Sequence, residues 1–312
     1  MDILLLVFWL IVGFILIIKG GDWFVDAAVY VAKITGIPSF IIGATIVSLA
    51  TTLPEVLVSV LASSVGNVDL AIGNAFGSVI ANLGLILGIS LSVSPSKNVS
   101  RGVFQKGFFM IGLTLISLVL MRDLILSNQE SIILWVMLVG FLWLNLLEVK
   151  DQEDNPIEKV QPTNTKKQII LFLLGAIMVV VGAELLVSSA SELAEILSVP
   201  QAVVGLTIVA LGTSLPEFVT TIMALIKKES GLSIGNIIGA NVLNMSFAIP
   251  ASVIASSGQL ITRPETISVD IPFSLWFMVI TIIPSLFKKR FYRWQGVLLI
   301  VSYLFYIIQT IL

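Results

Sequence analysis

The chain has no cysteine and no histidine, and it carries few charged side chains. Without cysteine it cannot form a disulfide bond, and without either residue the usual ligands of zinc, copper and haem sites are missing. Nucleophilic catalysis by a Ser-His or Cys-His pair is excluded for the same reason. A metal ion bound to this chain must therefore be one that accepts oxygen ligands.

The composition is that of a membrane protein. Of the 312 residues, 57% are hydrophobic and 12% are charged, and the mean hydropathy is +1.07, far outside the range of soluble proteins. A transmembrane helix needs about 20 mainly apolar residues. Ten such runs occur, at 3–22, 38–62, 70–92, 103–121, 130–148, 168–188, 200–226, 232–256, 267–287 and 293–311. The sequence predicts an all-α membrane protein with ten transmembrane helices.

The basic residues predict the orientation of these spans. Asp2 precedes the first apolar run and Lys19 follows it, the reverse of a secretory signal, so we expect this run to stay as the first span. With ten spans, fifteen of the 17 Lys and Arg residues fall on one side, and only Arg122 and Arg263 fall on the other. By the positive-inside rule the basic side is cytoplasmic. Both termini are then expected outside the cell or in the periplasm.

Two phrases in the chain reveal an internal duplication. "IVSLATTLPE" at 46–55 and "IVALGTSLPE" at 208–217 agree at seven of ten positions when the chain is shifted by 162 residues. The same shift aligns "IGNAFGSVIAN" at 72–82 with "IGNIIGANVLN" at 234–244, Gly20 with Gly182, Asp22 with Glu184, and Pro38 with Pro200. One ungapped register over so long a stretch indicates duplicated halves.

Each half holds five spans, an odd number, so the second half enters the membrane from the opposite face. We therefore expect two inverted repeats, at 1–149 and 168–312, joined by a cytoplasmic linker at 150–167 whose polar composition is typical of a solvated connection. Inverted repeats with broken spans at matching positions are typical of secondary transporters, whose binding sites lie near the middle of the bilayer.

Two acidic residues, Glu55 and Glu217, lie well inside predicted spans. A carboxylate at that depth costs about 3 kcal/mol or more, and no Lys or Arg lies at the same depth to pair with it. Two protonated glutamates could simply hydrogen-bond within the bundle. Intramembrane ionisable groups are functional by default, however, and these two recur in one register, which favours neutralisation by a bound cation.

A proline precedes each of these glutamates. Pro54 and Pro216 each remove a backbone hydrogen bond, which frees carbonyl oxygens near 48–50 and near 210–212. We expect each span to break there, so that the carboxyl end of a half-helix adds a negative dipole beside the glutamate.

Further oxygen ligands follow from spacing along the helices. Thr51 and Thr213 each lie four residues before a glutamate and share its helix face, and Thr52 and Ser214 come next in the chain. Polar stripes at four-residue spacing follow in the next spans, formed by Asn74, Ser78 and Asn82 and by Asn236, Ala240 and Asn244. Taken alone, such stripes fit interhelical packing as well as ligation. Their pairing with the Pro-Glu motifs favours ligation.

If the two halves meet, these groups form an all-oxygen cage with a charge of −2. Ca²⁺ takes six to eight oxygens in flexible geometry, whereas Mg²⁺ prefers a tight and partly hydrated octahedron. The cage therefore suits Ca²⁺, or several Na⁺ ions that share the same oxygens. Competition for one set of carboxylates is a means of coupling exchange.

At these residues the sequence resembles the sodium/calcium exchanger family of prokaryotic type, within the calcium/cation antiporters. "ATTLPE" and "GTSLPE", each followed by a Gly-Asn-rich motif, are similar to its two repeats, and the resemblance covers the whole chain. It implies that Thr51, Glu55, Thr213 and Glu217 bind calcium, that the carbonyls of Ser48 and Ala210 with Thr52, Ser78 and Ser214 form flanking sodium sites, and that Asn82 and Asn244 are a central polar pair.

The resemblance also implies how the protein works. Spans 1 and 6 would slide across a core of eight helices, and three Na⁺ would exchange for one Ca²⁺. The expected protein is a monomeric transporter of the inner membrane, with Ca²⁺, Na⁺ and lipid as partners. No cofactor, nucleic-acid partner or enzymatic activity is expected.

Three details of the motifs bear on ion choice. Ala240 stands where many relatives carry serine, which removes a hydroxyl from the outer sodium site, and Asn244 stands where potassium-dependent members carry aspartate. The Gly-Asn-x-x-Glu pattern of proton/calcium exchangers is absent after Gly73. A proton/calcium antiporter and a cation channel remain as alternatives, and an intramembrane hydrolase lacks a base or nucleophile system.

Overall fold

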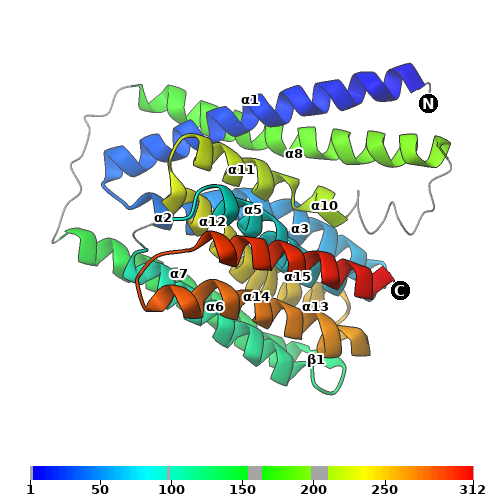
Figure 1. Cartoon of the computed structure of the whole chain (residues 1–312). Coiled ribbons are helices and arrows are strands. Elements are labelled where there is room, and N and C mark those ends of the chain that lie inside the picture. Colours follow the sequence, from blue (N-terminus) through cyan, green and yellow to red (C-terminus); the bar gives the residue numbers. More distant parts are fainter. Residues whose placement is uncertain (1–2, 97–98, 154–163, 198–209, 312) are drawn as a thin grey trace.

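A computed structural model of the chain describes residues 3–96, 99–153, 164–197 and 210–311. The start of the predicted seventh span, at 200–209, and most of the predicted linker lie outside the described residues. Within them the chain forms ten successive helical segments, some built from several elements (Figure 1). The ten-helix, all-α membrane fold predicted from the sequence is confirmed.

The first five segments are α1 (Ile3–Thr35), then α2, η1 and α3 (Ser39–Ile42, Gly43–Val47, Ser48–Ser64), then α4, η2 and α5 (Val68–Ala81, Asn82–Leu87, Gly88–Val93), then α6 (Arg101–Leu120) and α7 (Asn128–Glu153). The last five are α8 (Thr165–Ile196), then α10 and α11 (Ala210–Thr213, Leu215–Ile226), then α12, η4 and α13 (Ser230–Leu243, Asn244–Ala248, Ile249–Ala255), then η5 and α14 (Thr266–Asp270, Ile271–Leu286), and α15 (Arg293–Ile311). The elements labelled η are π-helical turns.

The first and sixth spans are much longer than their apolar runs. α1 has 33 residues and α8 has 32, so each is about 50 Å long and exceeds a hydrocarbon core of about 30 Å. The predicted ends at residues 22 and 188 were therefore too early. Both helices continue through charged positions, because a helix that tilts or leaves the hydrocarbon can present charge to polar partners.

The two long helices lie against each other along one side of the molecule (Figure 1). Gly13 packs on Gly182 and Gly20 packs on Gly175, so closely that a Cβ added to Gly13 would lie 2.9 Å from the carbonyl oxygen of Gly182. The 162-residue shift aligns Gly13 with Gly175 and Gly20 with Gly182, so the contacts are reciprocal and the helices antiparallel. This is the relation that inverted repeats require.

Loop contacts define two ends of the bundle. At one end, β1 (Ile125–Ser127) pairs antiparallel with β2 (Gln259–Ile261). At the other, the backbone nitrogen of Val99 donates to the carbonyl oxygen of Lys289 at 2.8 Å, and that of Phe291 donates to Ser96 at 2.9 Å. The start of α1 and the end of α15 lie on the same side of the molecule (Figure 1). The loops thus fall into two groups, one at each end of the bundle, as expected when ten spans cross the membrane in alternating directions.

The centre of the bundle consists of the segments that carry the repeated motifs. Every residue of α12 from Leu232 to Leu243 is buried, and the helix contacts α2, η1, α3 and α11. The π-helical turns η2 and η4 begin at Asn82 and Asn244, which the repeat aligns. The two halves therefore share a local distortion at the same place.

One basic residue lies deeper than the sequence suggested. Lys106 is one of the fifteen basic residues counted on the cytoplasmic side, but it lies within α6 with only 1% of its surface exposed. Its Nζ forms a 2.5 Å salt bridge with Glu148 of α7 and lies 4.5 Å from the ring centre of Phe40. A buried ammonium is tolerated here because a carboxylate and an aromatic face both offset its charge.

Candidate cation-binding site

The side chains of Glu55 and Glu217 lie side by side at the centre of the bundle. Glu55 belongs to α3 and Glu217 to the first turn of α11, both are completely buried, and each carboxyl group interacts electrostatically with the other. Thr52 donates a 3.1 Å hydrogen bond to Oε1 of Glu217. Within the described residues, neither oxygen of Glu55 has a hydrogen-bond partner, and neither has Oε2 of Glu217.

Orphaned carboxylate oxygens of this kind are expensive inside a membrane protein, because a fully buried polar group without a partner keeps its full desolvation cost. Among the described residues, no salt bridge involves either glutamate. Three unsatisfied oxygens from oppositely oriented halves therefore converge on one place. The structure brings the two carboxylates together as the sequence predicted.

Hydroxyl-bearing residues of α3 are buried near this pair. Ser48 and Thr52 are fully buried and Thr51 is nearly so. The hydroxyl of Thr51 lies 3.3 Å from the carbonyl oxygen of Ser48 and 3.2 Å from Oδ1 of Asn236, which ties α3 to α12. In the second repeat Ser214 is buried and its hydroxyl has no partner in the described part of the chain.

The prolines act differently in the two repeats. The expected break at Pro54 is wrong, because α3 runs without interruption from Ser48 to Ser64 and the distortion comes earlier, in η1. In the second repeat the helix does break: α10 ends at Thr213, Ser214 leaves helical geometry, and α11 begins with Pro216 in its first turn. Proline is well tolerated there because the first turn of a helix has no partner for that N–H.

Of the predicted amides, Asn74 and Asn236 contact α3, and Asn82 makes an unexpected pairing. Asn74 donates to the carbonyl oxygen of Glu55 at 3.0 Å and to the hydroxyl of Ser59 at 2.9 Å, so its NH₂ group holds the backbone of α3 in place. Asn82 donates at 3.0 Å to Oδ1 of Asn241, and not to its repeat counterpart Asn244.

Sequence reasoning missed Asn241 because the repeat aligns it with Val79 and so hides its polarity. Its amide follows Ala240 directly in "IGANVLN", and that was the available signal. Several oxygens remain unsatisfied among the described groups, namely Oδ1 of Asn82, Oδ1 of Asn244 and the hydroxyl of Ser78. Ala240 is fully buried and adds no oxygen side chain.

The donor set fits a hard cation. The described residues contain no group of three or more His, Cys, Asp or Glu side chains, so the two glutamates supply all the side-chain negative charge. Hydroxyl, amide and backbone oxygens make up the rest. Such a set suits Ca²⁺ or Na⁺ and offers nothing to a metal that requires nitrogen or sulfur.

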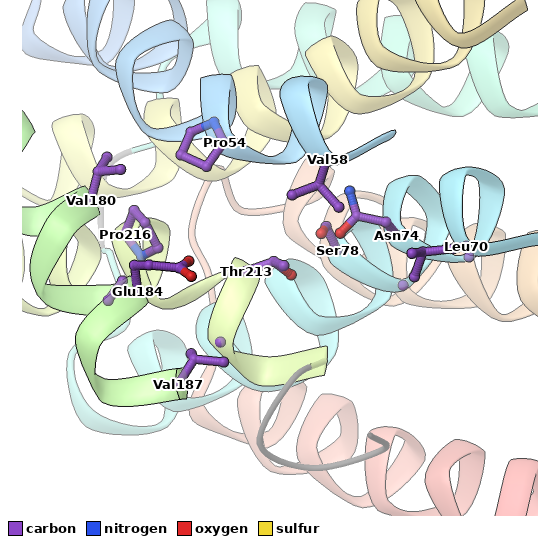
Figure 2. A pocket seen from close by; sticks show the side chains of 14 residues that line it. Pro54, Val58, Leu70, Asn74, Ser78, Val180, Glu184, Val187, Thr213 and Pro216 are labelled. Carbon is purple, nitrogen blue, oxygen red and sulfur yellow. The ribbon is translucent and has the colours of Figure 1, made fainter. Parts of the chain in front are cut away.

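A cavity of about 400 Å³ lies against one side of this site (Figure 2). Pro54 and Pro216, the neighbours of the two glutamates, line its inner wall together with Thr213, and Asn74 and Ser78 line it from α4. The remaining wall is formed by α8, so the cavity lies between part of α8 and the central helices, which α8 also contacts. Because each lining proline directly precedes a glutamate in the chain, the cavity ends next to both carboxylate-bearing residues.

The repeat-related positions on the other side are closed. Val58, which lines the cavity, is 37% exposed, and its counterpart Thr220 is 0% exposed. A Cβ added to Gly77 would meet no atom within 4 Å, whereas one added to Gly239 would lie 2.6 Å from the carbonyl oxygen of Ala44. The halves match in sequence but differ in packing, and the site is approached from one side.

Comparison with known proteins identifies the family. The profile described as "Sodium/calcium exchanger protein" matches residues 5–147 and 167–312. An uncharacterized membrane protein of Methanocaldococcus jannaschii is 31% identical over 307 residues, 95% of each chain. The sodium/calcium exchanger MaX1 of Methanosarcina acetivorans is 26% identical over 96% of each.

A solved structure of the sodium-calcium exchanger NCX_Mj, soaked with zero Na⁺ and Ca²⁺, superposes with a TM-score of 0.84 at 30% identity, and the match covers 99% of this chain and 100% of that one. The same fold, the same repeated motifs and a match along almost the whole chain lead to one conclusion. The chain belongs to the sodium/calcium exchanger family.

Proposed function

We propose that this protein exchanges Na⁺ for Ca²⁺ across the membrane by alternating access, and that Glu55 and Glu217 hold the exchanged ions. The observation that carries the proposal is the pair of buried carboxylates, contributed by inverted repeats beside a one-sided cavity, of whose four oxygens three have no hydrogen-bond partner among the described residues. The names of the relatives, as sodium/calcium exchangers, support the same ions. Ion transport, rather than catalysis, is the activity that this site serves.

Each group around the carboxylates has a proposed part. Ca²⁺ binds between the carboxylates, with the hydroxyls of Thr51 and Thr213 completing its ligands. Na⁺ ions use the flanking oxygens, namely the carbonyls of Ser48 and Ala210 and the side chains of Thr52, Ser78 and Ser214. The amides of Asn74, Asn82, Asn236 and Asn244 hold the surrounding helices and offer further oxygens. This division follows the chemistry of the donors, since Ca²⁺ requires more negative charge than Na⁺.

The charge of the site explains how Na⁺ transport is coupled to Ca²⁺ transport. Two carboxylates neutralise one Ca²⁺ or two Na⁺, so binding of one species excludes the other from the same oxygens. A third Na⁺ at the flanking oxygens would carry one net charge across the membrane in each cycle. We therefore propose electrogenic exchange of three Na⁺ for one Ca²⁺.

The asymmetry of the two halves supports alternating access. The structure has the site open on the cavity side and closed on the side of Gly239. Inverted repeats allow the two packings to be exchanged, which would close the first side and open the second. We propose that α1 and α8 move together against the central helices, and that the cavity side faces away from the cytoplasm, with both termini on that side.

The test is a flux assay with the purified protein in proteoliposomes loaded with Ca²⁺. We expect an inward Na⁺ gradient to drive Ca²⁺ release, and we expect neither K⁺ nor a pH gradient to replace it. An interior-negative membrane potential should accelerate this exchange, because three Na⁺ entering for one Ca²⁺ leaving carry one net positive charge into the vesicle. Clamping the interior positive should slow it. Release driven by a pH gradient alone would identify a proton/calcium antiporter, and rapid release without any counter-ion would identify a channel.

A further inference from the structure

One charged residue of the cavity has no part in the proposed ion site. Glu184 lies on α8 and is the one ionisable side chain among the described residues that line the cavity. Its side chain extends from α8 into the open space, toward Thr213 on α10 (Figure 2). It is solvent-exposed, whereas Glu55 and Glu217 are fully buried. An ion that enters the cavity therefore meets this carboxylate before it meets the other two.

The repeat provides an independent indication of what this position does. The counterpart of Glu184 is Asp22 on α1, and in this structure Asp22 already holds a cation, the ammonium group of Lys227. Nζ of Lys227 lies 2.6 Å from Oδ1 of Asp22 and 2.6 Å from Oδ1 of Asp26. A carboxylate at this point of the long helix is thus placed where a cation can reach it.

In the repeat, the cavity side has no counterpart of Lys227, and the nearby cation, Arg263, is in a salt bridge with Asp69. The 162-residue shift aligns Lys227 with Val65 and Asp26 with Ser188. On the closed side the carboxylate is occupied by a lysine from the loop after α11, and on the open side the equivalent carboxylate faces the cavity. The side that is closed by packing thus also has its carboxylate paired with a lysine, whereas the side with the cavity does not.

We propose that Glu184 is the entrance carboxylate of the transport pathway, which attracts hydrated Ca²⁺ and Na⁺ into the cavity and passes them to the buried oxygens beyond Pro54 and Pro216. This inference rests on the proposed exchange function. An exposed carboxylate keeps its ion hydrated, so it raises the local concentration of cations without trapping them. A divalent ion is favoured over a monovalent one because its attraction to a single charge is twice as large.

The test uses initial rates of Na⁺-driven Ca²⁺ exchange with Ca²⁺ supplied from the cavity side. For Glu184→Gln we expect the half-saturating Ca²⁺ concentration to rise about threefold to tenfold, with the maximal rate within about twofold of wild type. The difference should shrink as salt is raised, because screening weakens the attraction of an exposed charge. Glu184→Asp should restore the wild-type value.

Two controls separate recruitment from damage to the fold. Glu195→Gln removes the same charge from the same helix outside the cavity, and it should leave the half-saturating concentration unchanged. With Ca²⁺ supplied from the opposite side, Glu184→Gln should behave as wild type. Equal effects from both sides, a loss of maximal rate alone, or an unchanged half-saturating concentration would each overturn the inference and leave the exchange function standing. Wild-type protein without Na⁺-driven flux would overturn both.

Discussion

Glu55→Gln and Glu217→Gln each lower Na⁺-driven Ca²⁺ exchange at least about a hundredfold. Each change keeps the shape of the side chain and removes one of the two charges that face each other in the buried site. With Ca²⁺ bound between the carboxylates, removing one of them breaks a buried pairing of opposite charges, which costs about 3–5 kcal/mol, and about 1.4 kcal/mol corresponds to a factor of ten in affinity. With one carboxylate left, the site cannot neutralise a divalent ion at this depth.

The measurement is uptake of radioactive Ca²⁺ into Na⁺-loaded vesicles. Glu195→Gln, which removes an exposed carboxylate from the end of α8, is the matched control and should keep wild-type uptake. Both site variants should elute from size exclusion at the wild-type volume, since glutamine relieves an unpaired buried charge and does not add bulk. Uptake above a tenth of the wild-type rate in either variant would show that the ion binds elsewhere.

Gly239→Ala and Gly77→Ala shift the two access states in opposite directions. A Cβ at residue 239 would collide with Ser48 and lie 2.6 Å from the carbonyl oxygen of Ala44, so it strains the packing described here. A Cβ at residue 77 meets nothing within 4 Å and is tolerated in this state. Because the repeats exchange their packing, the same methyl group at residue 77 should strain the opposite state.

The size of the shift follows from the cost of overpacking, about 1–3 kcal/mol for an added methyl or methylene group in a packed core. We expect Gly239→Ala to move the equilibrium about tenfold or more toward the state open on the other side. Gly77→Ala moves it as far toward the state described here; the higher helix propensity of alanine acts in both states and does not change the shift.

The lack of native cysteine makes this shift measurable. Val58→Cys places a thiol in the open cavity, and Thr220→Cys places one at the closed, repeat-related position. With an impermeant maleimide, Gly239→Ala should slow labelling of residue 58 and speed labelling of residue 220, and Gly77→Ala should do the reverse. Parallel changes at both positions would mean loosening of the fold rather than an exchange of states. If Gly239→Ala does not fold, the labelling of residues 58 and 220 in Gly77→Ala still tests whether the two states exchange.

Much of the site could be predicted from the repeated motifs. The convergence of Glu55 and Glu217 followed from two facts, their shared register and the odd number of spans in each half. The burial of Thr51 and Thr52 beside them followed from helical spacing, and the structure agrees. Their role as ion ligands stays a prediction.

Other features depend on tertiary packing that a local pattern does not encode. The rule that proline breaks a helix failed at Pro54, where α3 is continuous, although the same motif breaks the helix at Ser214. Asn241 was invisible because the repeat aligns it with Val79. The one-sided cavity could not be foreseen either, since the two halves are so alike in sequence that only packing distinguishes the open side from the closed one.

The most direct measurement is equilibrium binding of Ca²⁺ to the purified wild-type protein at increasing Na⁺ concentration, together with Glu55→Gln and Glu217→Gln. The account predicts one Ca²⁺ per chain, displaced by Na⁺ more steeply than a single competing ion would allow, and no such binding in either variant. Ca²⁺ binding that is indifferent to Na⁺, or that persists when either glutamate is replaced, would contradict it.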